Sequence, residues 1–97
     1  MNPSIIISIL FLSFGFSQNK VNVNNLVQYG DKMFKENDDE PFSGLVFDMD
    51  KNTGNKILEY KMVNGLKDGF HSDFYSNGNK KTKGYYNKGL MNGKWTF

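Results

Sequence analysis

The chain has 97 residues, no cysteine, and a net charge of +2 from twelve lysines and ten acidic residues. A chain of this length forms at most one small domain. The lack of cysteine excludes disulfides, thiolate zinc sites and cysteine nucleophiles, and the lack of arginine excludes phosphate recognition by a guanidinium fork.

Residues 1–17 have the pattern of a secretory signal peptide. They contain no charged side chain, and residues 5–14 form an apolar run that only two serines interrupt. The run suits the hydrophobic region of a signal peptide and is too short for a bilayer core of about 30 Å. Gly15 and Ser17 are small residues at positions −3 and −1 if cleavage precedes Gln18. We therefore expect a periplasmic or secreted protein; an uncleaved interfacial anchor and a buried core element are the alternatives.

The rest of the chain is polarised in charge. Residues 18–50 carry three lysines and seven acidic residues, whereas residues 51–97 carry nine lysines and three acidic residues. A basic, aromatic-rich segment can attract nucleic acid or an anionic lipid surface. The alternative is that lysines on exposed strand faces keep a sheet soluble and block edge pairing. We favour the second interpretation and expect no nucleic-acid partner, because the chain lacks arginine and carries an export signal.

Strands and tight turns are predicted throughout residues 18–97. Helical periodicity is missing there, and glycine recurs every few residues, at a cost of about 1 kcal/mol each inside a helix. The strand-like runs in chain order are 26–29, 32–34, 45–49, 57–63, 70–75 and 80–86. The turn signals are Gly30-Asp31, Thr53-Gly54, Asn64-Gly65, Asp68-Gly69, Asn77-Gly78, Lys88-Gly89 and Asn92-Gly93.

A repeat with a shift of 24 residues follows the first predicted strands. Residues 64–69 reappear in similar form as residues 88–93, and Gly54-Asn55-Lys56 reappears as Gly78-Asn79-Lys80. A period of this size is typical of repeat arrays.

We divide the chain accordingly into a lead-in with a hairpin at 18–43, repeat units at 44–68 and 69–92, and a partial third unit at 93–97. Each complete unit is expected to form a hairpin that begins at a glycine. The structural repeat glycines are Gly44, Gly54, Gly65, Gly69, Gly78, Gly89 and Gly93.

These residues resemble a known repeat. The stretch from Gly69 to Gly78, Gly-Phe-His-Ser-Asp-Phe-Tyr-Ser-Asn-Gly, followed by Gly89 and Gly93, is similar to the MORN repeat. Residues 25–44 resemble the lead-in of bacterial MORN-repeat proteins of the YwqK antitoxin-like family. The resemblance covers residues 25–97 and implies an all-β fold, an elongated single-layer antiparallel sheet of repeated hairpins.

In such a sheet, a repeat glycine leaves space that an aromatic ring from a neighbouring strand can cover, so that rings stand in for a core. Alternation along the strand places Phe70, Ser72 and Phe74 on one face and His71, Asp73 and Tyr75 on the other. Both faces carry rings, and we expect one of them to receive a ligand or partner.

One segment partly matches a calcium-binding loop. Asp48, Asp50, Asn52 and Glu59 occupy positions 1, 3, 5 and 12 of an EF-hand. The motif needs glycine at position 6, where this chain has Thr53, and predicted strands replace the flanking helices. We therefore interpret the segment as a hairpin turn.

No constellation for catalysis is visible. His71 is the only histidine and takes an aromatic position of the repeat, equivalent to Trp95, so we expect it to pack rather than act as a general base. The serines lack a nucleophile elbow, and no glycine cluster precedes Lys-Ser or Lys-Thr as in a phosphate-binding loop. We expect no enzymatic activity, no cofactor and no metal.

The leading functional hypothesis is an exported, non-enzymatic repeat module that binds another protein. An antitoxin-like protein that neutralises a toxin by binding, as the resemblance implies, and a module that binds anionic membrane through its lysines are the alternatives. We expect the chain to be a fragment of a longer array or to be stabilised by a partner, because its last strand is an open edge. The candidate binding residues are Tyr75, Tyr85, Trp95, Lys80, Lys81 and Lys83.

Overall fold

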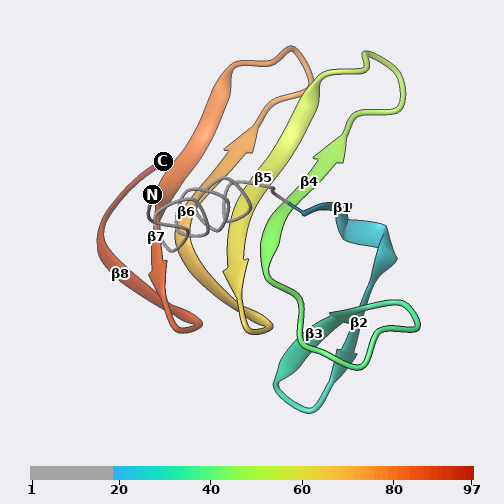
Figure 1. Ribbon diagram of the computed structural model, residues 1–97. Coiled ribbons are helices and arrows are strands. Elements are labelled where there is room, and N and C mark those ends of the chain that lie inside the picture. The colour runs from blue at the N-terminus through green and yellow to red at the C-terminus, as the bar shows by residue number, and fades with distance from the viewer. Residues whose placement is uncertain (1–18) are drawn as a thin grey trace, which may run out of the picture.

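A computed structural model describes residues 19–97, which form a six-stranded sheet and a separate two-stranded hairpin (Figure 1). The expected all-β fold is confirmed, and the predicted signal peptide lies outside the described residues. The elements are β1 (Lys20–Asn22), a 3-10 turn η1 (Val23–Asn25), β2 (Leu26–Tyr29), β3 (Lys32–Lys35), β4 (Gly44–Met49), β5 (Lys56–Val63), β6 (Leu66–Phe74), β7 (Lys80–Asn87) and β8 (Leu90–Thr96).

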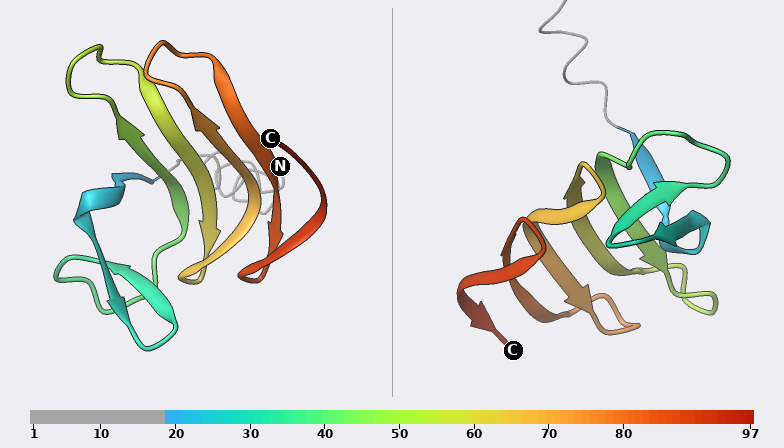
Figure 2. Two further views of the ribbon diagram at one scale, coloured as in Figure 1. Left: turned by 180° about the vertical axis from the view of Figure 1, so that it is seen from behind. Right: turned by 90° about the horizontal axis from the view of Figure 1, so that it is seen from below.

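The large sheet has the strand order β1-β4-β5-β6-β7-β8. From β4 to β8 each strand is antiparallel to the previous one, as expected for successive hairpins, whereas β1 pairs with β4 in parallel. The β2–β3 hairpin lies beside the β4 end of this twisted sheet (Figure 2). The chain therefore runs across the sheet in one direction, away from the lead-in.

All six predicted strand-like runs correspond to strands of the structure, whereas two of the predicted turns are wrong. Asp68-Gly69 lies within β6 and Asn92-Gly93 within β8, so these strands begin at Leu66 and Leu90. The pairing register shifts beside each pair, which marks a β-bulge. Gly69 and Gly93 have φ angles of +115° and +70°, which glycine adopts without steric cost. The sequence pattern of a turn here produces a bulge.

Strand β1 was not predicted, and it helps to build a core that the expected single layer would lack. The buried hydrophobic residues are Val21, Phe42, Val46, Tyr60 and Met62, with Val23, Leu26, Met33 and Leu58 packed against them. They come from the lead-in and from β4 and β5. Aromatic rings of the repeats therefore do not replace a core at this end of the sheet, because the lead-in covers it.

The lead-in is tied to the first repeat hairpin through backbone hydrogen bonds. The Met33 amide donates to the Gly65 carbonyl at 3.0 Å, and the Gly65 amide donates to the Phe42 carbonyl at 2.8 Å. Asn64 and Gly65 both have positive φ, as a two-residue type I′ turn requires. This turn joins β5 to β6, so it serves both as a hairpin turn and as the docking point of the lead-in.

One row of residues crosses the sheet and organises one of its faces. Val21, Val46, Tyr60, His71 and Gly84 are paired in register from β1 to β7, and all five are buried. The side chains of the first four residues point to the core side of the sheet, and a Cβ atom at Gly84 would point to the same side. We call this side the inner face and the opposite side the outer face. Adjacent residues along each strand alternate between the two faces.

Candidate binding face on strands β6 to β8

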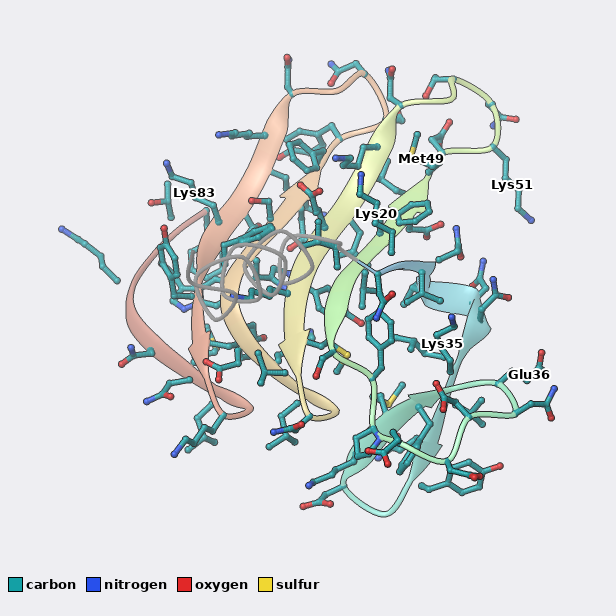
Figure 3. All side chains as sticks on the ribbon, viewed as in Figure 1. Lys20, Lys35, Glu36, Met49, Lys51 and Lys83 are labelled. Atoms are coloured by element: carbon teal, nitrogen blue, oxygen red, sulfur yellow. The ribbon has the colours of Figure 1, made fainter. Side chains whose placement is uncertain are left out.

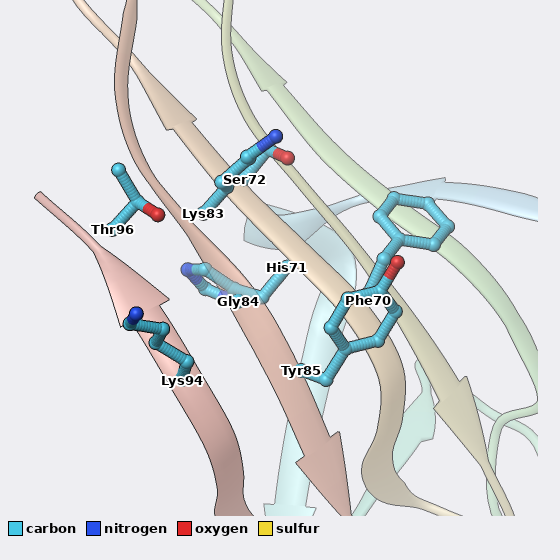
Figure 4. Close-up of a pocket in the computed structure, with 8 residues that line it drawn as sticks. All are labelled: Phe70, His71, Ser72, Lys83, Gly84, Tyr85, Lys94 and Thr96. Carbon is cyan, nitrogen blue, oxygen red and sulfur yellow. The ribbon is translucent and has the colours of Figure 1, made fainter.

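The outer face of β6, β7 and β8 contains a shallow hollow of about 120 Å³. Its lining residues come from three adjacent strands and include His71 and Gly84 (Figure 4). The other lining residues are Phe70, Ser72, Lys83, Tyr85, Lys94 and Thr96. A sheet positions such a set accurately, because each residue is held by its cross-strand partners.

Register explains how the hollow forms. Phe70 pairs with Tyr85, and Lys83 pairs with both Ser72 and Thr96. Two rings thus form one side of the hollow and a row of short polar and lysine side chains forms the other. Tyr85 is 60% exposed, which leaves its ring available to a partner. Exposed tyrosines often contribute much of the binding energy at protein interfaces.

This part of the molecule is strongly cationic. Residues 74–97 contain five lysines and no acidic residue. A second shallow hollow of about 180 Å³, lined by Lys80, Lys81, Lys83 and Phe97 among others, adjoins the first. In Figure 3, Lys83 on β7 lies far from Lys35 and Glu36 of the lead-in. The lysine-rich segment and the lead-in, which are separate in the sequence, therefore also lie apart in the folded molecule.

The six predicted binding residues do not form one site. Tyr85 and Lys83 line the first hollow, and Lys80, Lys81 and Lys83 line the second. Tyr75 is exposed at the β6–β7 turn, where the Lys81 Nζ atom lies 5.7 Å from its ring centroid.

Trp95, by contrast, is partly buried on the inner face. Its indole Nε1 donates to the Tyr85 carbonyl at 3.2 Å. Its ring lies where a Cβ atom at Gly84 would be, 2.1 Å from that position at the nearest atom. Trp95 was one of the candidate binding residues; in the structure, it packs against the sheet itself.

Three rings surround His71 on the inner face. The Tyr60 ring stacks on it with a centroid distance of 5.5 Å, and Tyr86 and Trp95 approach it at the same distance. The Lys67 Nζ atom lies 4.6 Å from the Tyr60 centroid and 4.9 Å from the Tyr86 centroid, within range of a cation–π interaction. His71 therefore has the packing role that its repeat position predicts.

The environment of His71 favours the neutral imidazole. Its Nε2 atom lies 3.1 Å from a carboxylate oxygen of Asp73, and its buried Nδ1 atom has no hydrogen-bond partner among the described residues. Burial, and then the nearby Lys67 charge, lower the pKa of His71 below its ordinary value of 6.5; Asp73 opposes this shift. Burial also lowers the pKa of Lys67 and raises that of Tyr60.

We predict that the protein loses stability as the pH falls from 6.5. The unfolded chain binds a proton at His71 more readily than the folded chain, because the folded pKa is the lower one. The stabilisation is therefore fully present above about pH 6.5 and is lost as the pH falls through the folded pKa. Urea midpoints at pH 7.5 and pH 5.5 measure this loss.

His71→Phe is the control, because it keeps a ring in the stack and removes the titration. Its urea midpoint should change less between the two pH values than that of the wild-type protein. The pKa of Asp50 is lowered from 3.8 by hydrogen bonds from Thr53, so its titration falls below this window. An equal loss in both proteins would show that another group is responsible.

The calcium-loop alternative gains no support from the described residues. The Asp50 Oδ2 atom accepts hydrogen bonds from the Asn52 and Thr53 amides at 3.0 and 2.8 Å and from the Thr53 hydroxyl at 3.1 Å. Its carboxylate thus organises the β4–β5 turn. Within residues 19–97, no group of three His, Cys, Asp or Glu side chains is placed to hold a metal ion.

A Ser-His-Asp arrangement is also not formed at the His71–Asp73 pair. Ser72 is adjacent to His71 in β6, so its side chain projects to the outer face. There it lines the hollow beside Lys83 and Thr96.

Five residues that line or support the hollow were not identified from the sequence: Phe70, Ser72, Gly84, Lys94 and Thr96. A signal for Gly84 exists, because the 24-residue shift aligns Tyr60 with Gly84 and His71 with Trp95. At the position where β5 carries the Tyr60 ring, β7 carries Gly84, and the Trp95 ring from β8 covers the space beside this glycine. The expected covering of a glycine by a ring therefore occurs, but at a glycine outside the predicted set.

Comparisons of the chain with protein-family models, with curated proteins and with solved structures found no match. Within residues 19–97, no helix has the length and apolar character needed to cross a bilayer.

Proposed function

We propose that the protein is an exported, non-enzymatic module that binds another protein through the outer face of β6, β7 and β8. The observation that carries this proposal is the hollow in which Phe70 and Tyr85 rings adjoin Lys83 and Lys94. Rings next to cations are suited to a partner surface that is both apolar and acidic.

The repeat supports a MORN-type assignment for the chain as part of the same proposal. The 24-residue shift relates β6 to β8 and β5 to β7, and it reproduces the bulge glycines Gly69 and Gly93. The antitoxin role that the resemblance implies is the same mode of binding with a toxin as partner. Export of the module rests on the signal-peptide pattern of residues 1–17.

We predict that Tyr85→Ala removes the proteins that the immobilised wild-type chain captures from the extracytoplasmic fraction of its own cells. Tyr29→Ala is the matched control, because Tyr29 is similarly exposed but lies in the β2–β3 hairpin. Lys83→Glu and Lys51→Glu form a second pair, in the hollow and in the distant β4–β5 loop. Quantitative mass spectrometry should show the same proteins depleted by the first member of each pair only.

Equal capture by all four variants would overturn the proposal. Flotation with vesicles of anionic and of neutral lipid distinguishes the membrane alternative. Binding to anionic vesicles that Lys83→Glu abolishes and Tyr85→Ala leaves intact would count for membrane binding and against a protein partner.

A further inference from the structure

Strand β8 lies at one edge of the sheet. Its backbone pairs with β7 on one side, and no strand within residues 19–97 pairs with its other side, which we call the β8 edge. Leu90, the first residue of β8, and Phe97, which directly follows the strand, are 74% and 84% exposed. Proteins commonly protect such edges with short strands, proline or several charges. Strand β8 has seven residues, no proline and one lysine, Lys94, so this protection is weak.

The opposite edge of the sheet differs. Strand β1 has only three residues, and its central residue, Val21, is buried in the core. A short edge strand offers few backbone groups to an incoming strand. The two ends of the sheet are therefore unequal, and the β8 edge is the one open to pairing.

The repeat shows which strand geometry fits the β8 edge. Residues 66–71 of β6 and 90–95 of β8 are equivalent by the 24-residue shift and carry the same bulge. Strand β6 pairs with β5 on one side and accepts β7 on the other, so the bulge does not prevent pairing on the far side. Strand β8 pairs with β7 as β6 pairs with β5, and its free side corresponds to the side on which β6 accepts β7.

We propose that the β8 edge accepts an acidic, extended, antiparallel segment of a partner protein, in the position that β7 takes on β6. This inference rests on the proposed function and specifies the form and charge of the partner. Addition of a strand to an exposed edge is a common mode of peptide recognition, in which backbone hydrogen bonds supply affinity and side chains supply specificity.

The acidic character follows from the side chains next to the edge. Tyr85 of β7 stands opposite Phe70 of β6 on the outer face. The equivalent position on β8 is Lys94, so a residue of the added segment opposite Lys94 projects over the outer face, where Lys83 also lines the hollow. A carboxylate there is attracted by two ammonium groups, whereas a lysine is repelled.

The inner side of the added segment needs small or apolar residues. His71 has Gly84 opposite it, and the equivalent residue on β8 is Trp95. Trp95 and Phe97 stack with a centroid distance of 6.3 Å, and they form an apolar surface beside the edge. The segment that fits therefore alternates acidic residues on the outer face with small or apolar residues on the inner face.

The test uses two blocked octapeptides built on residues 80–87, in the register of β7 on β6, where position 85 stands opposite the residue equivalent to Lys94. The acidic peptide carries Lys80→Glu, Lys81→Glu, Lys83→Glu and Tyr85→Glu, and the lysine peptide keeps the three lysines and carries Tyr85→Lys. Titration of the isotope-labelled protein with the acidic peptide should shift the amide signals of β8 and the Trp95 indole signal. The lysine peptide should bind about tenfold more weakly at low salt. The difference in affinity between the two peptides should shrink in 0.5 M NaCl, because charge interactions are screened at this salt concentration.

Two N-methylated forms of the acidic peptide test the pairing itself. Successive amides of a strand point to opposite sides, so methylation of alternate residues blocks one side only. One form should bind like the unmethylated peptide and the other should not bind. Lys94→Glu in the protein should weaken binding of the acidic peptide, whereas Lys51→Glu in the distant loop should not.

Equal binding of both methylated forms, or shifts confined to Tyr85 and its neighbours in the hollow, would overturn the edge proposal. Binding of the acidic and lysine peptides with equal affinity at low salt would overturn its acidic specificity. None of these results affects the proposed function, which fails instead when all four protein variants capture the same proteins equally. The two proposals can therefore fail separately.

Discussion

Replacing Tyr60 by alanine is expected to remove about 3–5 kcal/mol from the free energy of unfolding. The Tyr60 ring is buried, belongs to the core cluster and stacks on His71. It thus connects the core, which the lead-in covers, with the group of rings around His71 on β6 to β8. Domains of this size have a total stability of about 5–10 kcal/mol, so the variant should be close to unfolding at room temperature. Urea denaturation followed by circular dichroism measures the loss.

Two further variants show whether the loss of stability comes from the buried ring at position 60 or would follow the replacement of any tyrosine. Tyr60→Phe keeps the ring, and the Tyr60 hydroxyl makes no hydrogen bond to the described residues, so this variant should lose less than about 1 kcal/mol. Tyr85→Ala removes an exposed ring on the other face and should change stability by about 0.5 kcal/mol or less. A Tyr60→Ala protein as stable as Tyr85→Ala would contradict the central place of Tyr60 in the core.

Gly84→Ala is expected to expel Trp95 from the inner face. A Cβ atom at position 84 would lie 2.1 to 2.6 Å from three atoms of the indole ring. Such overpacking costs about 1–3 kcal/mol, which exceeds the 0.5–1 kcal/mol or so gained by removing glycine from a strand. We expect a net loss of about 1–2 kcal/mol and a red-shifted fluorescence emission. Trp95 is the only tryptophan, so the emission reports this position alone.

A double-mutant cycle with Trp95→Ala tests the cause. If the added methyl group acts only through the indole, Gly84→Ala should cost nothing in the Trp95→Ala background, and the two effects should be strongly non-additive. Lys83→Ala, one residue away on the outer face, should leave the emission unchanged. Additive effects of the two substitutions would show that Gly84 is required for a backbone reason and not for the ring.

Glycine-containing pairs made the strands of this protein predictable and also caused the main error. Asn64-Gly65 and Asp68-Gly69 have similar sequences, and both glycines have positive φ. The first pair forms a hairpin turn, whereas the second forms a bulge within β6. Both structures place the glycine at positive φ, +80° at Gly65 and +115° at Gly69, and the strand across from it decides between them. The pattern alone does not carry that information.

The hydrophobic core and the packing of the Trp95 ring over Gly84 depend on contacts between distant residues. Strand β1 has three residues, and it exists because Lys20–Asn22 pair with a strand about 25 residues later. No local pattern in so short a segment predicts parallel pairing. The hollow was found in part, through Tyr85 and Lys83, because exposed aromatic and lysine residues stand out in a sequence. Lys94 and Thr96 joined it only through the bulge register of β8.

The confinement of the hydrophobic core to the lead-in, β4 and β5 has a consequence for motion. Hydrogen-exchange protection in small domains follows local packing, and segments without buried apolar contacts open at the lowest free-energy cost. Strand β8 is joined to the molecule by one neighbour and by the Trp95 ring, so opening should begin there and spread towards β5. The end of the sheet with the aromatic and lysine hollow is then the end that a bound partner would order.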